Sequence, residues 1–312
     1  MSRPKLEERF TQPKNWLWGQ FNSVRDGALR FGQLAEHEAP RAHVVYILGL
    51  SEFSEKTFEL ARDFNNMACN FSVFDRYGQG ASPRYLDDPH KQHSDGIDAD
   101  VEDLIRYCET HIPAGEPIVL LGHSAGGLFG LHAIKKRPDL FAGAIFNAPL
   151  WGFENQPVKN RENFFAHLPL PSFIKQSYIP DGGPFTPRRE SKMKPDDFSS
   201  DPQRNKLDDY WRENNPELQT GSPTIGWVQQ MCKGIMRIRK SGFAESIKTP
   251  VLLFTGGADN LVNNDRIRKF AKRLSNVEIH DFEDGKHELL VEKDSIRKPL
   301  MEKIENFLKN KI

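Results

Sequence analysis

The chain has 312 residues, of which 38% are apolar, 11% aromatic and 28% charged, a composition typical of a folded globular protein that excludes a disordered or fibrous one. Lysine and arginine together number 43, as do aspartate and glutamate, so the formal net charge is zero and a broad nucleic-acid-binding surface is disfavoured. A chain of this length forms one or two domains and buries enough apolar surface to fold without disulfides or a structural metal.

The N-terminal residues 1–21 have neither an uninterrupted apolar stretch nor a small-residue cleavage site, which argues against a secretory signal. Residues 21–25 and 29–36 alternate loosely and predict an antiparallel hairpin that turns at Asp26 and Gly27. From residue 41 onward, short apolar runs typical of buried parallel strands alternate with longer amphipathic segments. The expected strands are residues 43–49, 71–76, 117–122, 141–149, 250–257 and 277–283. The expected helices are residues 57–69, 97–111, 125–136, 265–274 and 294–308.

This alternation predicts an α/β fold with a mostly parallel central sheet and helices on both faces. In the helix at 97–111 we expect the acidic side chains to face solvent, namely Asp98, Asp100, Glu102 and Asp103. The alternation stops between residues 151 and 247, which hold ten of the 21 prolines and three of the five tryptophans. An irregular insert of this length is expected to be functional or to form a small subdomain. One helical stripe within it contains Ile225, Val228, Cys232 and Ile235.

The strongest local signal is the sequence Gly-His-Ser-Ala-Gly at residues 122–126, between the strand expected at 117–122 and the helix expected at 125–136. At such a strand-to-helix elbow the serine lies in a strained turn, and its neighbours must be small. Ser124 is therefore the candidate nucleophile. Residues 117–134 are uncharged and nearly long enough to span a membrane, but their proline and glycines favour a strand, a turn and a helix.

A serine hydroxyl becomes nucleophilic when a base removes its proton and a third group orients that base. In an elbow fold the acid follows a late strand and the histidine follows the last one. Asp259 and His287 occupy these two loops and are the candidate acid and base. Asp281 and Asp284 are alternative acids, but they lie in or just after the last strand, beside the base.

Two other groups of residues suggest different chemistry. His90 and His93, with Asp95 nearby, imitate a metal cluster, but a solvated loop is the favoured interpretation. The three cysteines are scattered and indicate reduced thiols in a cytoplasmic protein, not a disulfide framework or a metal site. They are Cys69, Cys108 and Cys232. Neither a metal nor an organic cofactor is expected.

Attack on a carbonyl creates an oxyanion, which needs hydrogen-bond donors. One donor is expected to be the backbone N–H of Ala125, next to the nucleophile, and the other an N–H from the loop after the strand at 43–49. Leu50 is the candidate in that loop.

Several segments, in order from about residue 20 to the C-terminus, resemble the monoacylglycerol lipase and bacterial lysophospholipase branch of the α/β-hydrolases, also called serine aminopeptidase-like hydrolases. They include YILGLSEF, FDRYGQGASP, LLGHSAGG, FNAPLWGF, FTGGADNLVNN and DGKHELLVEKD. The resemblance implies a triad of Ser124, Asp259 and His287, with Leu50 and Ala125 at the oxyanion hole. The family usually has histidine before the glycine of the oxyanion loop, whereas this chain has Leu48, so the side-chain support of the loop differs.

The resemblance also implies an α/β-hydrolase core of residues 1–150 and 248–312, with residues 151–247 as a mainly helical cap. The large apolar residues of this cap line an acyl-chain slot or form the cap's own core. They are Phe164, Phe165, Phe173, Trp211, Trp227, Met231 and Met236. A basic group near the end of one cap helix faces anionic headgroups or is a solvated helix end. It consists of Lys233, Arg237, Arg239 and Lys240.

We therefore expect a serine hydrolase that cleaves a carboxylic ester of a monoacyl lipid, of the lysophospholipase or monoacylglycerol lipase type, through an acyl-serine intermediate. The alternatives are hydrolysis of a peptide N-terminus, a short ester or a lactone, and a homologue that binds a ligand without turnover. The expected partner is a small-molecule or lipid ester, not a nucleic acid. The expected location is the cytoplasm, with peripheral contact at the inner membrane surface and the oligomeric state left open.

Overall fold

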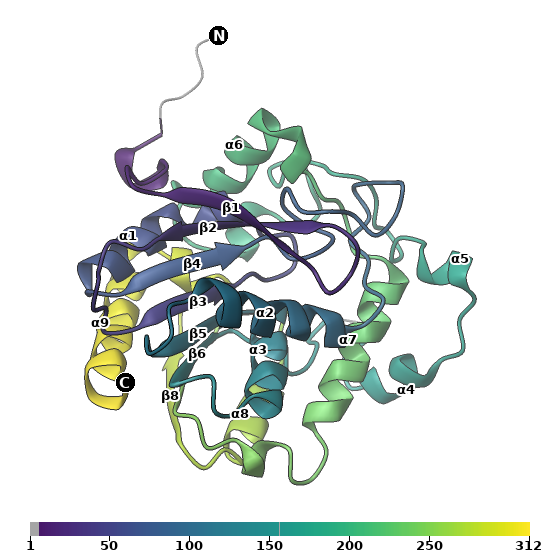
Figure 1. Cartoon of the computed structure of the whole chain (residues 1–312). Coiled ribbons are helices and arrows are strands. Elements are labelled where there is room, and N and C mark those ends of the chain that lie inside the picture. Colours follow the sequence, from purple (N-terminus) through teal and green to yellow (C-terminus); the bar gives the residue numbers. More distant parts are fainter. Residues whose placement is uncertain (1–5, 156) are drawn as a thin grey trace.

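The computed structural model describes residues 6–155 and 157–312 and has one central sheet flanked by helices (Figure 1). Eight strands of the described chain form this sheet in the order β1-β2-β4-β3-β5-β6-β7-β8. β2 pairs antiparallel with β1 and β4, and every other neighbouring pair is parallel. The strands are β1 (Leu17–Asn22), β2 (Ala28–Leu34), β3 (His43–Ile47), β4 (Asn70–Phe74), β5 (Ile118–His123), β6 (Gly143–Asn147), β7 (Val251–Gly256) and β8 (Val277–Phe282). The predicted mostly parallel α/β fold is confirmed.

Helices cover both faces of the sheet (Figure 1). One apolar cluster includes side chains from α2, α3, α7 and α8, and the other includes side chains from α1 and α9. These helices are α1 (Phe58–Asn66), α2 (Ile97–His111), α3 (Ala125–Lys136), α7 (Ile225–Ile238), α8 (Asn264–Ala271) and α9 (Asp294–Lys311). Successive strand residues point to opposite faces, and both faces are covered, so all five residues of β3 are buried. This explains the near-continuous apolar runs in the sequence.

α2 and α3 begin and end where the sequence pattern predicts. The solvent-facing positions in α2 were only partly right, because Asp100 and Asp103 are buried. Arg25, in the turn between β1 and β2, lies 3.6 Å from Asp100 and 3.4 Å from Asp103. Asp103 also accepts hydrogen bonds from the Ser23 hydroxyl and the Val24 N–H. Pairing with a distant turn, which helical periodicity does not register, therefore buries these two carboxylates.

The first strand of the predicted hairpin was misplaced, because β1 covers Leu17–Asn22 instead of residues 21–25. The turn itself is correct, since the Ser23 N–H donates to the Gly27 carbonyl at 3.0 Å. Gly19 interrupts the apolar pattern of β1, and its missing side chain is replaced by the ring of Phe31 on β2. A Cβ on Gly19 would lie 2.4 Å from this ring. Packing against β2 therefore stabilises β1, although the sequence pattern of β1 does not predict a strand.

The described residues between β6 and β7 form helices joined by irregular segments, as expected. They include α4 (Glu162–His167), α5 (Ser172–Lys175), α6 (Lys206–Asn214) and α7. The Thr224 hydroxyl caps α7 by accepting from the Trp227 N–H at 3.1 Å. α7 packs on α2 and α3, and its buried Met231 and Ile235 join the core of the sheet. This helix therefore serves as the crossover from β6 to the parallel β7, while the division of the chain at residues 151 and 247 stays a prediction.

The uncharged window at 117–134 forms β5, a one-residue turn and α3, as predicted. Within the described ranges, every helix is too short or too polar to cross a lipid bilayer.

Candidate active site

Ser124 occupies the turn between β5 and α3 with φ 50° and ψ −119°. A positive φ is unusual for a residue with a Cβ atom, and its cost of about 1–3 kcal/mol must be met by the surrounding structure. The Ser124 N–H donates to the Asn147 carbonyl at 3.1 Å, and the Ser124 carbonyl accepts from the N–H groups of Gly127 and Leu150. Backbone contacts with β6 and the segment that follows it thus hold the strained serine at the carboxyl edge of the sheet.

Small residues around Ser124 are required by close backbone contacts. A Cβ on Gly122 would lie 2.9 Å from the backbone of Gly126, and one on Gly127 would lie 2.5 Å from Pro149. The glycines of the predicted elbow therefore have a steric function, because β5 and α3 meet at a distance that a side chain would prevent.

His287 and Asp259 form the pair that the sequence predicts. The Nδ1 atom of His287 lies 2.7 Å from Asp259 Oδ2, and both side chains are buried. The other carboxylate oxygen of Asp259 accepts from the N–H groups of Leu261 and Val262 at 2.8 and 3.2 Å. Three hydrogen bonds thus fix the carboxylate in the loop after β7, and this carboxylate fixes the ring in the loop after β8.

The charge of this pair shifts both pKa values. Burial alone would lower the pKa of His287, but the carboxylate of Asp259, with smaller contributions from Glu288 and Glu52, outweighs burial and raises that pKa above its ordinary value. Burial alone would raise the pKa of Asp259, but His287 and the two backbone N–H groups lower it. The pair therefore favours an ionised carboxylate and a basic imidazole.

The structure brings His287 next to the elbow. Its ring centroid is 4.8 Å from that of His123, the residue before Ser124. Within the described chain the Ser124 hydroxyl forms no hydrogen bond to His287, a contact that often tightens only when substrate is bound. The pair and the candidate nucleophile therefore share one small region at the carboxyl ends of β5, β7 and β8.

The alternative residues make other contacts. Asp281 pairs with Arg268 at 2.9 Å, and Asp284 is exposed. His90 Nδ1 accepts from the Phe185 N–H, and His93 Nδ1 lies 2.8 Å from the Thr224 hydroxyl. These contacts give each group a protein partner or solvent and leave Asp259 as the carboxylate at His287.

The predicted oxyanion loop, residues 49–52, lies beside the nucleophile. A Cβ on Gly49 would be 3.2 Å from Ser124 Cβ. The Gly49 N–H donates to Glu52 Oε2 at 2.6 Å, so a hydrogen bond joins the first and last residues of the loop. Ser51 has φ 65°, which makes the turn tight. Leu50 thus follows the glycine that lies against Ser124, and Ala125 follows Ser124 at the start of α3.

Leu48 explains how the loop is supported without the histidine usual in the family. Its side chain is fully buried and packs in the core cluster on the α1 and α9 side of the sheet. Its carbonyl accepts from Arg76 Nε at 3.3 Å. Support for this loop therefore comes from Glu52 and Arg76.

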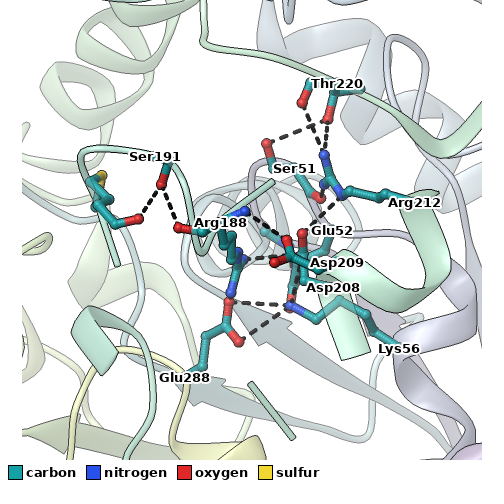
Figure 2. A network of polar contacts seen from close by, with 12 residues as sticks. Ser51, Glu52, Lys56, Arg188, Ser191, Asp208, Asp209, Arg212, Thr220 and Glu288 are labelled. Carbon is teal, nitrogen blue, oxygen red and sulfur yellow. Dashed lines mark hydrogen bonds and ion pairs between the residues drawn. The ribbon is translucent and has the colours of Figure 1, made fainter. Parts of the chain in front are cut away.

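A buried ionic network behind this loop was not predicted from the sequence (Figure 2). Glu288, the neighbour of His287, pairs with Arg188 at 2.9 Å and Lys56 at 3.2 Å. Burial alone would raise the pKa of Glu288, but these two cations hold it well below its usual range. Asp208, on α6, lies 3.1 Å from Arg212 and 3.3 Å from Arg188. The network thus joins the insert to the oxyanion loop, through Lys56, and to the loop that holds His287, through Glu288.

The same network contains the cluster in the described chain whose geometry would best suit a cation: Glu52, His123 and Glu288, with ligand atoms within 4.8 Å of one another. Lys56 lies 3.7 Å from Glu52 and also pairs with Glu288. Because the Lys56 ammonium lies between the two carboxylates and pairs with both, it already supplies the positive charge at this cluster.

The apolar residues of the insert fall into two groups. Trp227 and Met231, on α7, are buried in the core, whereas Phe164 and Phe173, on α4 and α5, are 60% and 72% exposed. Three more are partly buried: Phe165, Trp211 and Met236. Of the basic group, Arg237 pairs with Asp98 at 2.5 Å and Arg239 with the buried Glu162 at 3.1 Å.

Comparison with known proteins agrees with this geometry. The family described as serine aminopeptidase, S33, matches residues 38–294. The probable lysophospholipase L2 of Haemophilus influenzae is 25% identical over 302 residues, which cover 95% of this chain and 92% of that protein. The monoacylglycerol lipase of Paleococcus ferrophilus has a similar structure, with a TM-score of 0.68, 21% identity, and coverage of 90% of this chain and 98% of that one.

A thermostable carboxyl esterase from Bacillus coagulans has the same fold, with a TM-score of 0.76, 17% identity, and coverage of 96% of this chain and 99% of that one. The matched range of the family includes Ser124, Asp259 and His287. The chain belongs to the serine aminopeptidase (S33) family and is an ester hydrolase of the lysophospholipase and monoacylglycerol lipase branch of the α/β-hydrolases.

Proposed function

We propose that the protein hydrolyses the ester of a monoacyl lipid through an acyl intermediate on Ser124. The observation that carries this proposal is the buried His287–Asp259 pair, joined at 2.7 Å and lying against the elbow of Ser124. Such a pair supplies the base that a serine hydroxyl needs.

In this mechanism Nε2 of His287 takes the proton of the Ser124 hydroxyl while the serine oxygen attacks the ester carbonyl carbon. The carbonyl oxygen becomes an oxyanion that accepts from the backbone N–H groups of Leu50 and Ala125. When the carbon–oxygen bond to the alcohol breaks, His287 returns the proton to the leaving alkoxide. Water, deprotonated by His287, then attacks the acyl carbon of the acyl-serine. The bond between this carbon and the Ser124 oxygen breaks, His287 returns the proton to that oxygen, and the carboxylic acid leaves. Asp259 holds the tautomer of His287 throughout.

Support for a monoacyl lipid substrate comes from the relatives, which carry the names lysophospholipase and monoacylglycerol lipase. An open cleft of about 520 Å³ lies between the α4–α5 connection and α7 and is lined in part by Leu168, Leu170, Lys175 and Lys233. Its lining contains none of Ser124, Asp259 and His287, so this cleft gives no indication of the substrate. We also propose that the exposed Phe164 and Phe173 contact the lipid surface from which substrate is drawn, since aromatic side chains with nearby lysines suit a membrane interface.

The first test is labelling with a fluorophosphonate, followed by peptide mass mapping. Ser124 should carry the label in the wild type, and Ser124→Ala and His287→Ala should lose it. His280→Ala is the matched control, because His280 is half-buried on β8 but contacts Glu278 instead of Asp259. Labelling at another serine, or full labelling without His287, would overturn the mechanism.

The second test compares substrates, since esters, amides and lactones all present a carbonyl to the same site. Lysophospholipids and monoacylglycerols should give a higher kcat/KM than short esters, aminoacyl amides or lactones. A preference for aminoacyl amides would replace the lipid substrate with a peptide N-terminus. Absence of turnover on every member of the panel, in a protein that binds these lipids, would favour the ligand-binding alternative.

A further inference from the structure

Arg76 is a buried cation for which the reaction scheme gives no role. It follows β4, is 4% exposed, and lies with its guanidinium 4.3 Å from the ring centroid of Phe129. Within the described chain its side chain has no carboxylate within ion-pair distance. A buried charge without an ion-pair partner is costly. Its location therefore calls for an explanation.

The hydrogen bonds of Arg76 go to the oxyanion loop. Nε donates to the Leu48 carbonyl at 3.3 Å, and Nη2 donates to the Gly49 carbonyl at 3.4 Å and to Gln79 Oε1 at 2.9 Å. Gln79 in turn donates from Nε2 to the carbonyls of Gly49 and Glu52, each at 3.0 Å. Gln79 is also buried, at 3% exposure. The two side chains thus form a single brace whose shared target is the Gly49 carbonyl.

The peptide bond that contains this carbonyl also contains the Leu50 N–H. In a trans peptide the C=O and N–H point in opposite directions. Donors that hold the Gly49 carbonyl on the Arg76 side therefore turn the Leu50 N–H toward the opposite side. The neighbouring N–H groups are already used, since Gly49 donates to Glu52 and Ser51 donates to Gln92. In the described part of the chain, the Leu50 N–H donates to no protein acceptor and is free for a substrate oxygen.

The brace also affects the strength of this donor. A hydrogen bond accepted by a peptide carbonyl polarises the N–H of the same peptide, and a cationic donor does so more strongly than a neutral one. Burial lowers the pKa of Arg76, but a guanidinium remains protonated at neutral pH. The positive charge of Arg76 thus lies on the carbonyl side of the Gly49–Leu50 peptide. Negative charge develops on the substrate oxygen at the N–H side of the same peptide during the reaction.

We propose that Arg76, with Gln79, is a positioning residue that orients and polarises the Gly49–Leu50 peptide for oxyanion binding. This inference rests on the proposed function, in which Leu50 is an oxyanion donor. The brace acts in the transition state more than on the bound ester, because the carbonyl oxygen becomes an anion only after attack. Loss of the brace should therefore reduce kcat and leave KM nearly unchanged.

The test measures kcat and KM on a short p-nitrophenyl ester, and the affinity for a trifluoromethyl ketone, which forms an oxyanion on the serine. Arg76→Met should lower kcat by about 10-fold to 100-fold, a fraction of the loss expected when an oxyanion donor is removed outright. The affinity for the ketone should fall by a similar factor, and KM should change less than about twofold. Arg76→Lys, which keeps the charge but not the fork of donors, should give a smaller loss.

Gln79→Met is the second variant, and it keeps the proposal testable if Arg76→Met does not fold. It removes the neutral half of the brace and should give a smaller loss of kcat with the same unchanged KM. The control is Arg62→Met, because Arg62 donates to the backbone carbonyls of Arg9, Thr11 and Phe58, none of which belongs to the oxyanion loop at residues 49–52. This control should keep the wild-type kcat.

Two outcomes would overturn the inference and leave the proposed function in place. One is a folded Arg76→Met or Gln79→Met variant with wild-type kcat and wild-type affinity for the ketone. The other is a loss of kcat in Arg62→Met equal to that in Arg76→Met, which would indicate a general effect on stability. If Ser124→Ala keeps the wild-type kcat, the proposed function fails and the inference fails with it. If Ser124→Ala is inactive and the brace variants are fully active, the inference alone fails.

Discussion

A Cβ atom on Gly126 would lie 2.0 Å from the carbonyl oxygen of Ile47. Ile47 ends β3, the strand that leads into the oxyanion loop, and Gly126 lies in the first turn of α3, directly after Ala125. This one contact therefore sets how close the Leu50 loop can come to the start of α3. The relative position of the two N–H groups proposed for the oxyanion hole, those of Leu50 and Ala125, therefore depends on this contact.

Replacing Gly126 with alanine should force β3 and α3 apart. Overpacking of this kind costs about 1–3 kcal/mol of stability, and the displaced donors should also slow labelling of Ser124. Urea unfolding and the rate of fluorophosphonate labelling measure the two effects. Gly183→Ala is the control, because nothing lies within 4 Å of a Cβ at Gly183. Equal stability and labelling in the two variants would contradict the steric role of Gly126.

The raised pKa of His287 predicts the acidic limb of the pH–rate profile. The histidine must be neutral to act as a base, so kcat/KM should fall as pH decreases through a pKa above the ordinary value of 6.5. Asp259→Asn removes the largest of the charges that raise this pKa, while Glu288 and Glu52 remain. The limb should then move to lower pH, and kcat should fall by about 10³-fold to 10⁴-fold because the tautomer is no longer held. Asp284→Asn, at an exposed position in the same region, should leave the limb in place.

Arg212 should support the oxyanion loop from the insert. Its guanidinium donates to the Ser51 carbonyl and, at 2.9 Å, to the Thr220 carbonyl (Figure 2). Arg212→Ala should reduce kcat because Ser51, at φ 65°, loses a contact that holds its left-handed conformation. Adding Ser51→Gly should restore part of the activity, since glycine adopts this conformation without strain.

Arg204→Ala is the comparison for Arg212→Ala. Arg204 is equally buried in the insert but pairs with Glu59 and Asp294, away from the loop. It should lose stability and keep kcat. If Ser51→Gly does not improve the kcat of Arg212→Ala, Arg212 acts on something other than the conformation of Ser51.

The raised pKa of Asp100 predicts a specific dependence of folding stability on pH. Burial raises its pKa to about 6, although Arg25 opposes the shift. The folded state then binds a proton that the unfolded state, with a carboxyl pKa near 3.8, has lost, so stability should fall as pH rises from about 4 to 6. Two pKa units correspond to about 3 kcal/mol. Asp100→Asn should flatten this part of the curve in urea unfolding, whereas Asp98→Asn, at an exposed site on α2, should not.

Local sequence signals were sufficient for the parts of the fold in which neighbours in the chain cooperate. The elbow at Ser124 was predictable because the strand, the small residues and the helix all lie within one segment, and α2 and α3 have the bounds that their periodicity indicates. The loops that hold Asp259 and His287 followed from the order of the strands. Their mutual contact at 2.7 Å is a tertiary fact that the sequence only suggests.

The remaining features depend on contacts between distant segments. Gly19 is in a strand because Phe31 covers it, and Asp100 is buried because Arg25 reaches it from a turn. The sequence shows Glu288 only as an acidic residue next to a histidine. Its ion pairs with Lys56 and Arg188 form only when the chain folds. Periodicity measures how a segment meets the solvent on average, so it cannot identify a charged side chain that finds its partner far along the chain.

The pairing of β6 with β7 has a consequence for how the protein is made. Ala144 pairs with Val251, so more than a hundred residues must be synthesised before β6 gains its second neighbour. At about 5–20 residues per second this takes roughly 5–20 s. During that interval β6, whose residues are all buried in the finished sheet, is a bare apolar edge on the ribosome-bound chain. Misassembly during synthesis should therefore concentrate at this edge, which a chaperone or the emerging helices of the insert can shield.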